Sequence, residues 1–191
     1  MKYYLIAGEA SGDLHGSNLI KGLKKYDSEA QFRIWGGDLM AEAAGVELVK
    51  HYKTYDYMGI VEVVKHAKLI LNNIQFCKDD IAAHRPDAII FIDFPGFNLK
   101  IAPFAKSIGI RTFFYISPTV WAWKESRVKT IKATIDHMFV ELPFVKKFYE
   151  TRHNYYVDFE GHPLLDSIAQ FKEKYSVEEF KRMNSIPDKK L

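Results

Sequence analysis

The sequence predicts an α/β protein built on a Rossmann-like, doubly wound parallel sheet. Short apolar runs alternate with segments of helical periodicity, and a glycine or proline follows most of them. The clearest strand is residues 88–92, Ala-Ile-Ile-Phe-Ile, followed by Asp93 and then, one residue later, a Pro-Gly pair. A short apolar run rich in β-branched residues is typical of a strand buried on both faces of a parallel sheet.

The first half of the chain contains two strands and three helices ahead of that run. In order, they are a strand at 3–7 before Gly8, a helix at 13–25, a strand at 32–35 before Gly36, a helix at 38–44 before Gly45 and a long helix at 60–81 before Pro86. In each longer helix, apolar residues recur three or four positions apart. A glycine directly after a helix favours the left-handed conformation that ends it.

The second half continues the same alternation. In order, its elements are a helix at 97–108 before Gly109, a strand at 112–116 before Pro118, a helix at 126–134, a strand at 137–140, a helix at 143–149 and a strand at 156–159 before Gly161. Strands that alternate with helices form βαβ units with right-handed crossovers, so we expect six parallel strands.

We expect residues 1–170 to form this domain and residues 171–191 to form a polar helical tail. The tail is rich in Lys and Glu and leads towards an element that the chain does not contain. This pattern indicates the N-terminal part of a larger protein; a frayed natural terminus is the alternative.

The composition is that of a globular protein, with 48% hydrophobic and 27% charged residues. A net charge of +3 is too small to indicate nucleic-acid binding. The single cysteine, Cys77, excludes an intramolecular disulfide and fits a reducing cytosol. We find no secretory signal and no run of roughly 18 apolar residues, so we expect any membrane contact to be peripheral.

Neither a metal nor a cofactor is expected. The seven histidines are scattered without metal-binding spacing, and no nucleophile triad is visible. The first strand-to-helix turn, Gly8-Glu9-Ala10-Ser11-Gly12-Asp13, is not a dinucleotide fingerprint because its glycines lie four apart. It is either a site for a polar ligand or a simple turn with Ser11 as the helix N-cap.

Asp93 is the best candidate for chemistry. It follows a buried strand, and open α/β sheets bind their ligands beyond the carboxyl ends of the strands. The alternative is that Asp93 only caps the next helix, since Asp is common at that position.

Two further segments carry candidate site residues. Met58 and Glu62 stand where the long helix opens, and a helix dipole alone would favour that carboxylate. After the strand at 112–116, the sequence Ser-Pro-Thr-Val-Trp-Ala-Trp places Trp121 and Trp123 in a loop, with Arg127 beyond them. Such tryptophans are either core plugs or the wall of a ligand site.

In this order, the segments GEASGD, MGIVEV, IDFPGFN, SPTVWAW with Arg127, and GHPLLD resemble the lipid-A-disaccharide synthases. The resemblance covers about residues 3–168. These enzymes are inverting hexosyltransferases of two-domain GT-B architecture, so the resemblance implies that the chain is the N-terminal half of a GT-B enzyme. The essential aspartate of the family's DxPxFN segment matches Asp93.

The resemblance further implies a reaction and its partners. The family transfers 2,3-diacylglucosamine from its UDP-linked donor to the 6-hydroxyl of 2,3-diacylglucosamine 1-phosphate (lipid X). Asp93 would be the base, and the absent C-terminal domain would hold the nucleotide. The acceptor side would be lined by Gly8, Glu9, Ser11, Gly12, Asp13, Met58, Glu62, Asn98, Ser117, Trp121 and Trp123, with Arg127 near the acceptor phosphate.

The lipid substrates imply a cytoplasmic protein at the cytoplasmic face of the inner membrane. The long helix, with Lys65, Lys68, Val61, Leu69 and Ile70, is a candidate membrane contact, although core packing explains these residues equally well. The sequence leaves open whether the protein forms a homodimer. The alternatives are a nucleotide-sugar epimerase of the same scaffold and a non-catalytic module that binds acyl sugars.

Overall fold

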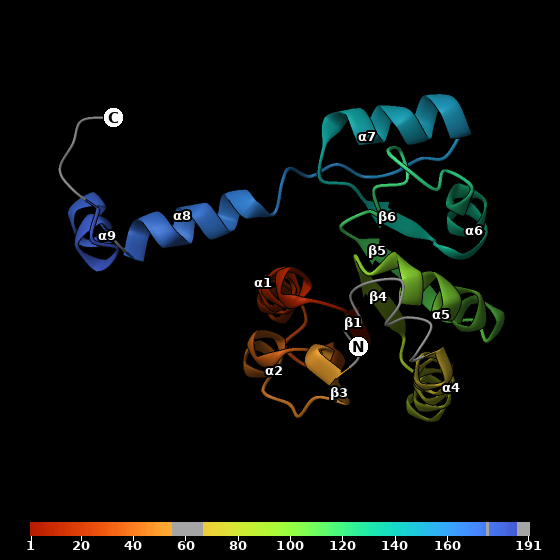
Figure 1. Ribbon diagram of the computed structural model, residues 1–191. Helices are drawn as coiled ribbons and strands as arrows, with labels where there is room; N and C mark the ends of the chain where they lie inside the picture. Colours follow the sequence, from red (N-terminus) through yellow and green to blue (C-terminus); the bar gives the residue numbers. More distant parts are fainter. Residues whose placement is uncertain (55–66, 175, 187–191) are drawn as a thin grey trace. The chain divides into compact units, whose positions relative to one another are not determined.

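In the part of the chain that the structure describes, the sheet has six parallel strands in the order β3-β2-β1-β4-β5-β6, which confirms the predicted doubly wound fold (Figure 1). The computed structural model describes residues 1–54, 67–174 and 176–186. The strands are β1 Lys2–Ala7, β2 Gln31–Gly36, β3 Lys50–His51, β4 Ala88–Ile92, β5 Arg111–Tyr115 and β6 His137–Phe139. The strand order reverses between β1 and β4, so the ligand crevice of such sheets is expected there.

The helices follow the strands as the periodicity predicted. They are α1 Ala10–Tyr26, α2 Asp38–Ala44, the 3-10 turn Tyr52–Thr54, α4 Ala67–His84, α5 Pro95–Ser107, α6 Arg127–Thr134, α7 Pro143–Lys147, the π-helical turn Phe148–Arg152, α8 Leu164–Lys174 and α9 Val177–Met183. The long helix expected from residue 60 is described from Ala67 onward. Its first residues and the candidates Met58 and Glu62 lie outside the described residues.

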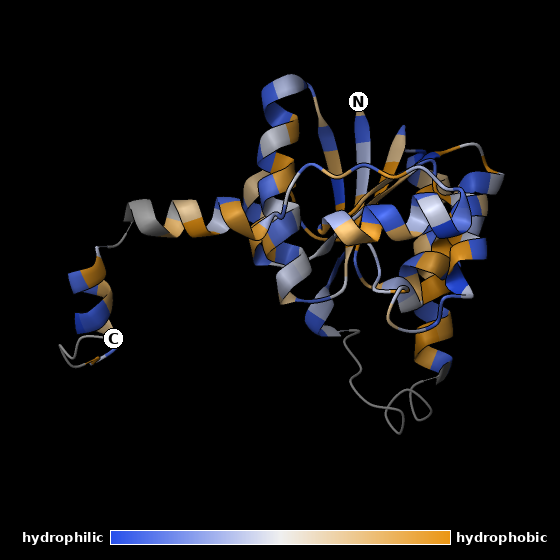
Figure 2. Cartoon of the chain, turned by 90° about the horizontal axis from the view of Figure 1, so that it is seen from above, coloured by the Kyte–Doolittle hydropathy of each residue, from blue (hydrophilic) through white to orange (hydrophobic). Residues whose placement is uncertain are grey.

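Each face of the sheet has its own core because successive strand residues point to opposite sides. In β1, Leu5 packs into the cluster that contains residues of α1 and α2. The next residue, Ile6, packs into the cluster that contains residues of α4, α5 and α6. Figure 2 shows helices on both sides of the strands. All five residues of β4 are buried and they contribute to both clusters, which confirms the strand buried on both faces.

Two elements differ from the sequence prediction. The expected strand at 156–159 is a single parallel bridge between Phe139 and Asp158, since only Val157 of that run is fully buried and Tyr156 is 70% exposed. The sixth strand is instead β3, which has two residues and pairs with the end of β2. It was missed because Lys50 and His51 have no apolar pattern, and their pairing arises from the packing of the chain after α2.

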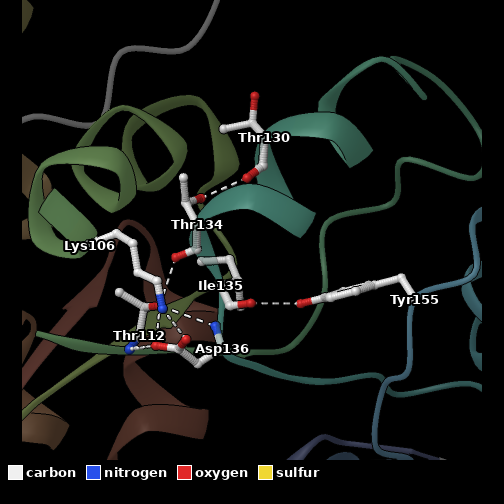
Figure 3. A network of polar contacts seen from close by, with 7 residues as sticks. All are labelled: Lys106, Thr112, Thr130, Thr134, Ile135, Asp136 and Tyr155. Atoms are coloured by element: carbon white, nitrogen blue, oxygen red, sulfur yellow. Dashed lines mark hydrogen bonds and ion pairs between the residues drawn. The ribbon is translucent and has the colours of Figure 1, made fainter. Parts of the chain in front are cut away.

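At the amino ends of β5 and β6, a polar network ties the α6–β6 turn to the sheet (Figure 3). The Asp136 carboxylate accepts hydrogen bonds from the Thr112 backbone N–H at 3.0 Å and from its Oγ1 at 3.1 Å. Lys106 forms an ion pair with the same carboxylate. Tyr155 donates its hydroxyl to the carbonyl of Ile135 at 3.0 Å. These contacts hold β5 and β6 from the edge opposite to Asp93.

The chain divides into two compact units, Met1–Phe159 and Glu160–Leu191. The second contains α8, which runs across the residue 170 boundary expected from the sequence, and α9, which begins with a capping box between Ser176 and Glu179. That residues 171–191 lead to a nucleotide-binding domain stays a prediction. Within the described ranges, no helix is long and apolar enough to cross a membrane.

Asp13 has a structural role that the sequence did not reveal. Its carboxylate is buried and accepts hydrogen bonds from three backbone N–H groups at the start of α2, those of Gly37 at 2.9 Å, Leu39 at 3.1 Å and Met40 at 2.9 Å. A Cβ at Gly37 would lie 2.4 Å from this carboxylate, so the contact requires glycine there. Asp13 therefore caps α2 from a neighbouring helix.

We expect Asp13→Asn to lower the free energy of unfolding by about 2 kcal/mol, because the amide nitrogen would face a backbone donor and the charge-assisted bonds would be lost. Urea denaturation of the 191-residue chain measures this. The control is Glu42→Gln, which changes an exposed carboxylate further along α2; we expect it to change the value by less than about 0.5 kcal/mol. Equal effects of the two substitutions would contradict the cap.

Candidate functional site

The candidate site lies where β1 and β4 end side by side. The two strands are in register up to Ala7 and Ile92, so Gly8 and Asp93, which follow them, leave the sheet at the same edge. This is the point at which the strand order reverses. The fold therefore places Asp93 at the end of the sheet where such folds bind their ligands.

The chain turns sharply after β4 because two consecutive residues adopt left-handed backbone conformations, Asp93 with φ 43° and Phe94 with φ 48°. Such conformations are unfavourable for residues other than glycine and cluster at functional sites. The fully buried Asn98 holds this turn: its Nδ2 donates to the Asp93 carbonyl at 2.7 Å, and its backbone N–H donates to the Phe94 carbonyl at 3.0 Å.

Asp93 is not the cap of α5. The helix begins at Pro95, and its N-cap residue is Phe94, which makes no side-chain capping bond. The carboxylate therefore does not perform the capping task that would explain an aspartate before a helix. The capping alternative raised by the sequence is wrong.

The turn after β4 interlocks with the turn after β1. A Cβ at Gly8 would lie 2.2 to 2.6 Å from ring atoms of Phe94, so a side chain at Gly8 would displace that ring. The Phe94 ring also stacks on Phe97 with 5.5 Å between centroids. The absence of a side chain at Gly8 therefore allows the two turns to approach each other closely.

Burial, together with the negative charges of Glu9 and Glu141, raises the pKa of the Asp93 carboxyl to about 6, while the Phe94 backbone N–H opposes them. Glu9 follows β1 and Glu141 follows β6 closely, so the carboxyl edge of the sheet gathers three acidic groups. Asp93 thus takes up a proton more readily than an ordinary aspartate. The described residues contain no group of three or more His, Cys, Asp and Glu side chains suited to a metal ion.

Glu141 also fixes the start of the loop after β5. Its Oε2 accepts hydrogen bonds from the Ser117 backbone N–H at 3.1 Å and from the Ser117 hydroxyl at 2.9 Å. Ser117 is thereby buried at the same edge as Asp93. The sequence reading missed Glu141, although it follows a strand almost as directly as Asp93 does.

The two loop tryptophans are not core plugs. Trp121 is 42% exposed and Trp123 is 58% exposed, whereas Val120 beside them is buried and anchors the loop. Trp121 meets Phe144 of α7 edge to face, with 4.9 Å between ring centroids. The loop therefore presents aromatic surface to solvent, as a binding wall would.

Two cations accompany Trp123. The Lys124 ammonium lies 4.1 Å from the ring centroid and the Arg127 guanidinium lies 5.6 Å from it. Arg127 is the first residue of α6, as the sequence predicted within one residue. The combination of an exposed ring and two positive charges suits a ligand with an apolar part and an anionic part.

In the turn after β1, the residues have different roles from those predicted from the sequence. Glu9, not Ser11, is the N-cap residue of α1, and the Ser11 hydroxyl donates to the Glu9 carboxylate. Gly12 is buried, and a Cβ there would lie 3.1 Å from that of Ala7. Glu9 and Ser11 are exposed at the edge of the sheet, whereas both carboxylate oxygens of Asp13 are engaged by α2.

Comparison with known proteins shows the family to which the chain belongs. The family model for lipid-A-disaccharide synthetase matches residues 3–190. The chain belongs to the lipid-A-disaccharide synthetase family. This confirms the resemblance carried by the motifs at the strand ends.

Named relatives of this synthetase family agree. The lipid-A-disaccharide synthase of Chromohalobacter salexigens is 42% identical over 168 residues, which are 88% of this chain and 43% of that protein. That of Geobacter metallireducens is 44% identical over 165 residues, which are 86% of this chain and 42% of that protein. The chain therefore spans less than half the length of these relatives.

Solved structures confirm the fold alone. A UDP-GlcNAc 2-epimerase from Neisseria meningitidis, solved with UDP-GlcNAc, matches with a TM-score of 0.67 at 13% identity, over 96% of this chain and 52% of that chain. The Staphylococcus aureus MnaA–UDP structure matches with a TM-score of 0.64 at 12% identity, over 92% of this chain and 48% of that one. These proteins share the GT-B scaffold with the synthetase family, so the epimerase alternative is supported only as a fold.

We expect Asp93→Asn to raise the melting temperature of the chain more at pH 7.5 than at pH 4. The folded-state pKa of about 6 lies above the ordinary 3.8, so the stability that protonation contributes is full below 3.8 and is lost as the pH rises through about 6. At about 1.36 kcal/mol per pKa unit, Asp93→Asn should raise the free energy of unfolding at pH 7.5 by at most about 3 kcal/mol. The increase should be smaller than this limit because the carboxyl is partly exposed.

Calorimetry at both pH values measures this difference. The control is Asp79→Asn on α4, where the side chain is exposed and should give the same small change at both pH values. An equal effect of Asp93→Asn at pH 4 and pH 7.5 would mean that the carboxyl titrates as an ordinary aspartate.

Proposed function

We propose that this chain is the acceptor-binding part of a lipid-A-disaccharide synthase. The reaction is transfer of 2,3-diacylglucosamine from UDP-2,3-diacylglucosamine to the 6-hydroxyl of 2,3-diacylglucosamine 1-phosphate. Family membership supports this activity. The single structural observation that carries it is the Asp93 carboxylate, which lies where the strand order reverses and does not cap α5.

In the proposed mechanism, Asp93 is the general base. It accepts the proton of the acceptor 6-hydroxyl as that oxygen attacks the anomeric carbon of the donor, and UDP leaves with the electron pair of the broken bond. A carboxylate with a pKa of about 6 is largely ionised at neutral pH, yet is a stronger base than an ordinary aspartate. Both properties favour this role.

The acceptor binds along the same edge of the sheet. Its sugar hydroxyls would meet the exposed Glu9 and Ser11 and the turns after β1 and β4; the buried Asn98 holds the second of these turns from within α5. Its acyl chains would lie against aromatic surface of the 117–126 loop, where Trp121 and Trp123 are exposed. By resemblance, Met58 and Glu62 also belong to this side.

Arg127 is the candidate contact for the acceptor 1-phosphate. Its guanidinium lies over Trp123, beside the Lys124 ammonium, so two positive charges are available next to apolar surface. Arginine suits this task because its planar group can bind two phosphate oxygens together. The nucleotide would be held by the part of the relatives' length that this chain does not span.

We also propose peripheral contact with the cytoplasmic face of the inner membrane, because both substrates carry acyl chains. In the described part of α4, Leu69, Leu71 and Phe76 are 40%, 61% and 49% exposed. Exposed apolar residues on a helix with Lys68 beside them fit an interfacial contact. Ile70 is instead packed against the core.

We expect Asp93→Asn in the full-length protein to lower the rate of disaccharide formation by about 10³-fold, within the usual contribution of a general base. Thin-layer chromatography of the lipid product measures the rate. Asp79→Asn serves as the control and should retain the full rate. Because Asp93→Asn is expected to stabilise the fold near neutral pH, a loss of activity could not be assigned to unfolding. A rate within tenfold of the wild type would exclude Asp93 as the base.

A further inference from the structure

Glu141 links the ends of two neighbouring strands. It follows β6 after Val140, its side chain is half-buried, and its Oε2 accepts both the backbone N–H and the hydroxyl of Ser117, which follows β5. One carboxylate oxygen thus receives two hydrogen bonds from one residue of the facing loop. Hydrogen bonds to an ionised acceptor are about twice as strong as neutral ones.

These bonds are made directly after a strained residue. Ile116 has φ 66°, a left-handed conformation that is a genuine outlier for a β-branched side chain and is energetically unfavourable. Ile116 turns the chain out of β5 and into the loop that carries Trp121. Without a contact that holds Ser117, the backbone at Ile116 would relax and the loop would move with it.

The same two segments meet a second time further from the sheet. Phe144, three residues after Glu141, contacts Trp121, four residues after Ser117, edge to face at 4.9 Å. The polar contact near the sheet and the aromatic contact farther along therefore join the loop after β5 to the start of α7 at two points.

The strained turn is also tied to Asp93. The Asp93 backbone N–H donates to the carbonyl of Tyr115 at 3.3 Å, and Tyr115 directly precedes Ile116. The charged groups that act on the Asp93 carboxyl are Glu9 from the turn after β1 and Glu141 itself, with the Phe94 backbone N–H opposing both. Glu141 therefore affects Asp93 through the backbone and through its charge.

We propose that Glu141 is a positioning residue for the proposed transfer reaction: it holds the strained turn at Ile116, fixes the loop bearing Trp121 and Trp123, and presents its charge to Asp93. This inference rests on the proposed function for its catalytic meaning. Its geometric content is independent of that function. Nothing in the chemistry requires Glu141 to touch the substrate.

Two substitutions separate its two effects. In Glu141→Gln the side-chain carbonyl can still accept both Ser117 hydrogen bonds, so the loop stays and only the charge is lost. In Glu141→Ala both are lost. The control is Glu42→Gln, which removes the same charge from an exposed position on α2.

Carbon-13 NMR of labelled aspartate in the 191-residue chain reports the Asp93 titration, and acrylamide quenching reports the exposure of the loop tryptophans, since Trp35 is fully buried. In Glu141→Gln we expect the Asp93 midpoint to fall and quenching to stay unchanged. In Glu141→Ala we expect quenching to increase. An Asp93 midpoint that is the same in Glu141→Gln and in the wild type would overturn the proposal, and so would a shift equal to that in Glu42→Gln.

Kinetics of the full-length protein test the catalytic meaning. For Glu141→Gln we expect the acidic limb of the kcat/KM profile to move to lower pH, because the base titrates at lower pH. For Glu141→Ala we expect KM for the acceptor to rise by roughly tenfold or more, as the acceptor loop is no longer held. An unmoved acidic limb in Glu141→Gln contradicts the proposal. If the wild type forms no disaccharide while the NMR shift is observed, the proposed function fails and the positioning by Glu141 stands.

Discussion

The arrangement of the carboxyl ends of the strands depends on one backbone constraint, the left-handed pair Asp93–Phe94 at the end of β4. This turn lets α5 begin at Pro95 without a side-chain cap, places the Phe94 ring over Gly8, and leaves the Asp93 carboxylate unused by the helix. The buried Asn98 holds the turn through its amide. A different turn here would send α5, and the core that it covers, in another direction.

The stability of the fold comes from parts of the structure other than the carboxyl ends of the strands, where several interactions are unfavourable. Two apolar clusters cover the two faces of the sheet, and the amino ends of β5 and β6 are tied by the network around Asp136. By contrast, the carboxyl edge collects three carboxylates and the strained Ile116. Strain and like charge of this kind are typical of functional sites, where the rest of the structure offsets their cost.

The sequence predicted the strand of residues 88–92, its parallel neighbours and the position of Asp93, because an apolar run followed by Pro-Gly reports local structure directly. It could not predict that Asp13 caps α2 or that Glu141 binds Ser117, since each contact joins residues 24 or more positions apart. The sequence also favoured a strand at 156–159 over β3, because strand pairing at a sheet edge depends on tertiary packing more than on pattern.

The most direct test is a crystal structure of the chain with 2,3-diacylglucosamine 1-phosphate. We expect the sugar beyond the ends of β1 and β4, with its 6-hydroxyl oxygen about 2.6–3.2 Å from an Asp93 carboxylate oxygen, the reach of a general base. The acyl chains should contact the loop of Trp121 and Trp123. An acceptor bound with its 6-hydroxyl directed away from Asp93, or bound at another edge of the sheet, would contradict the account.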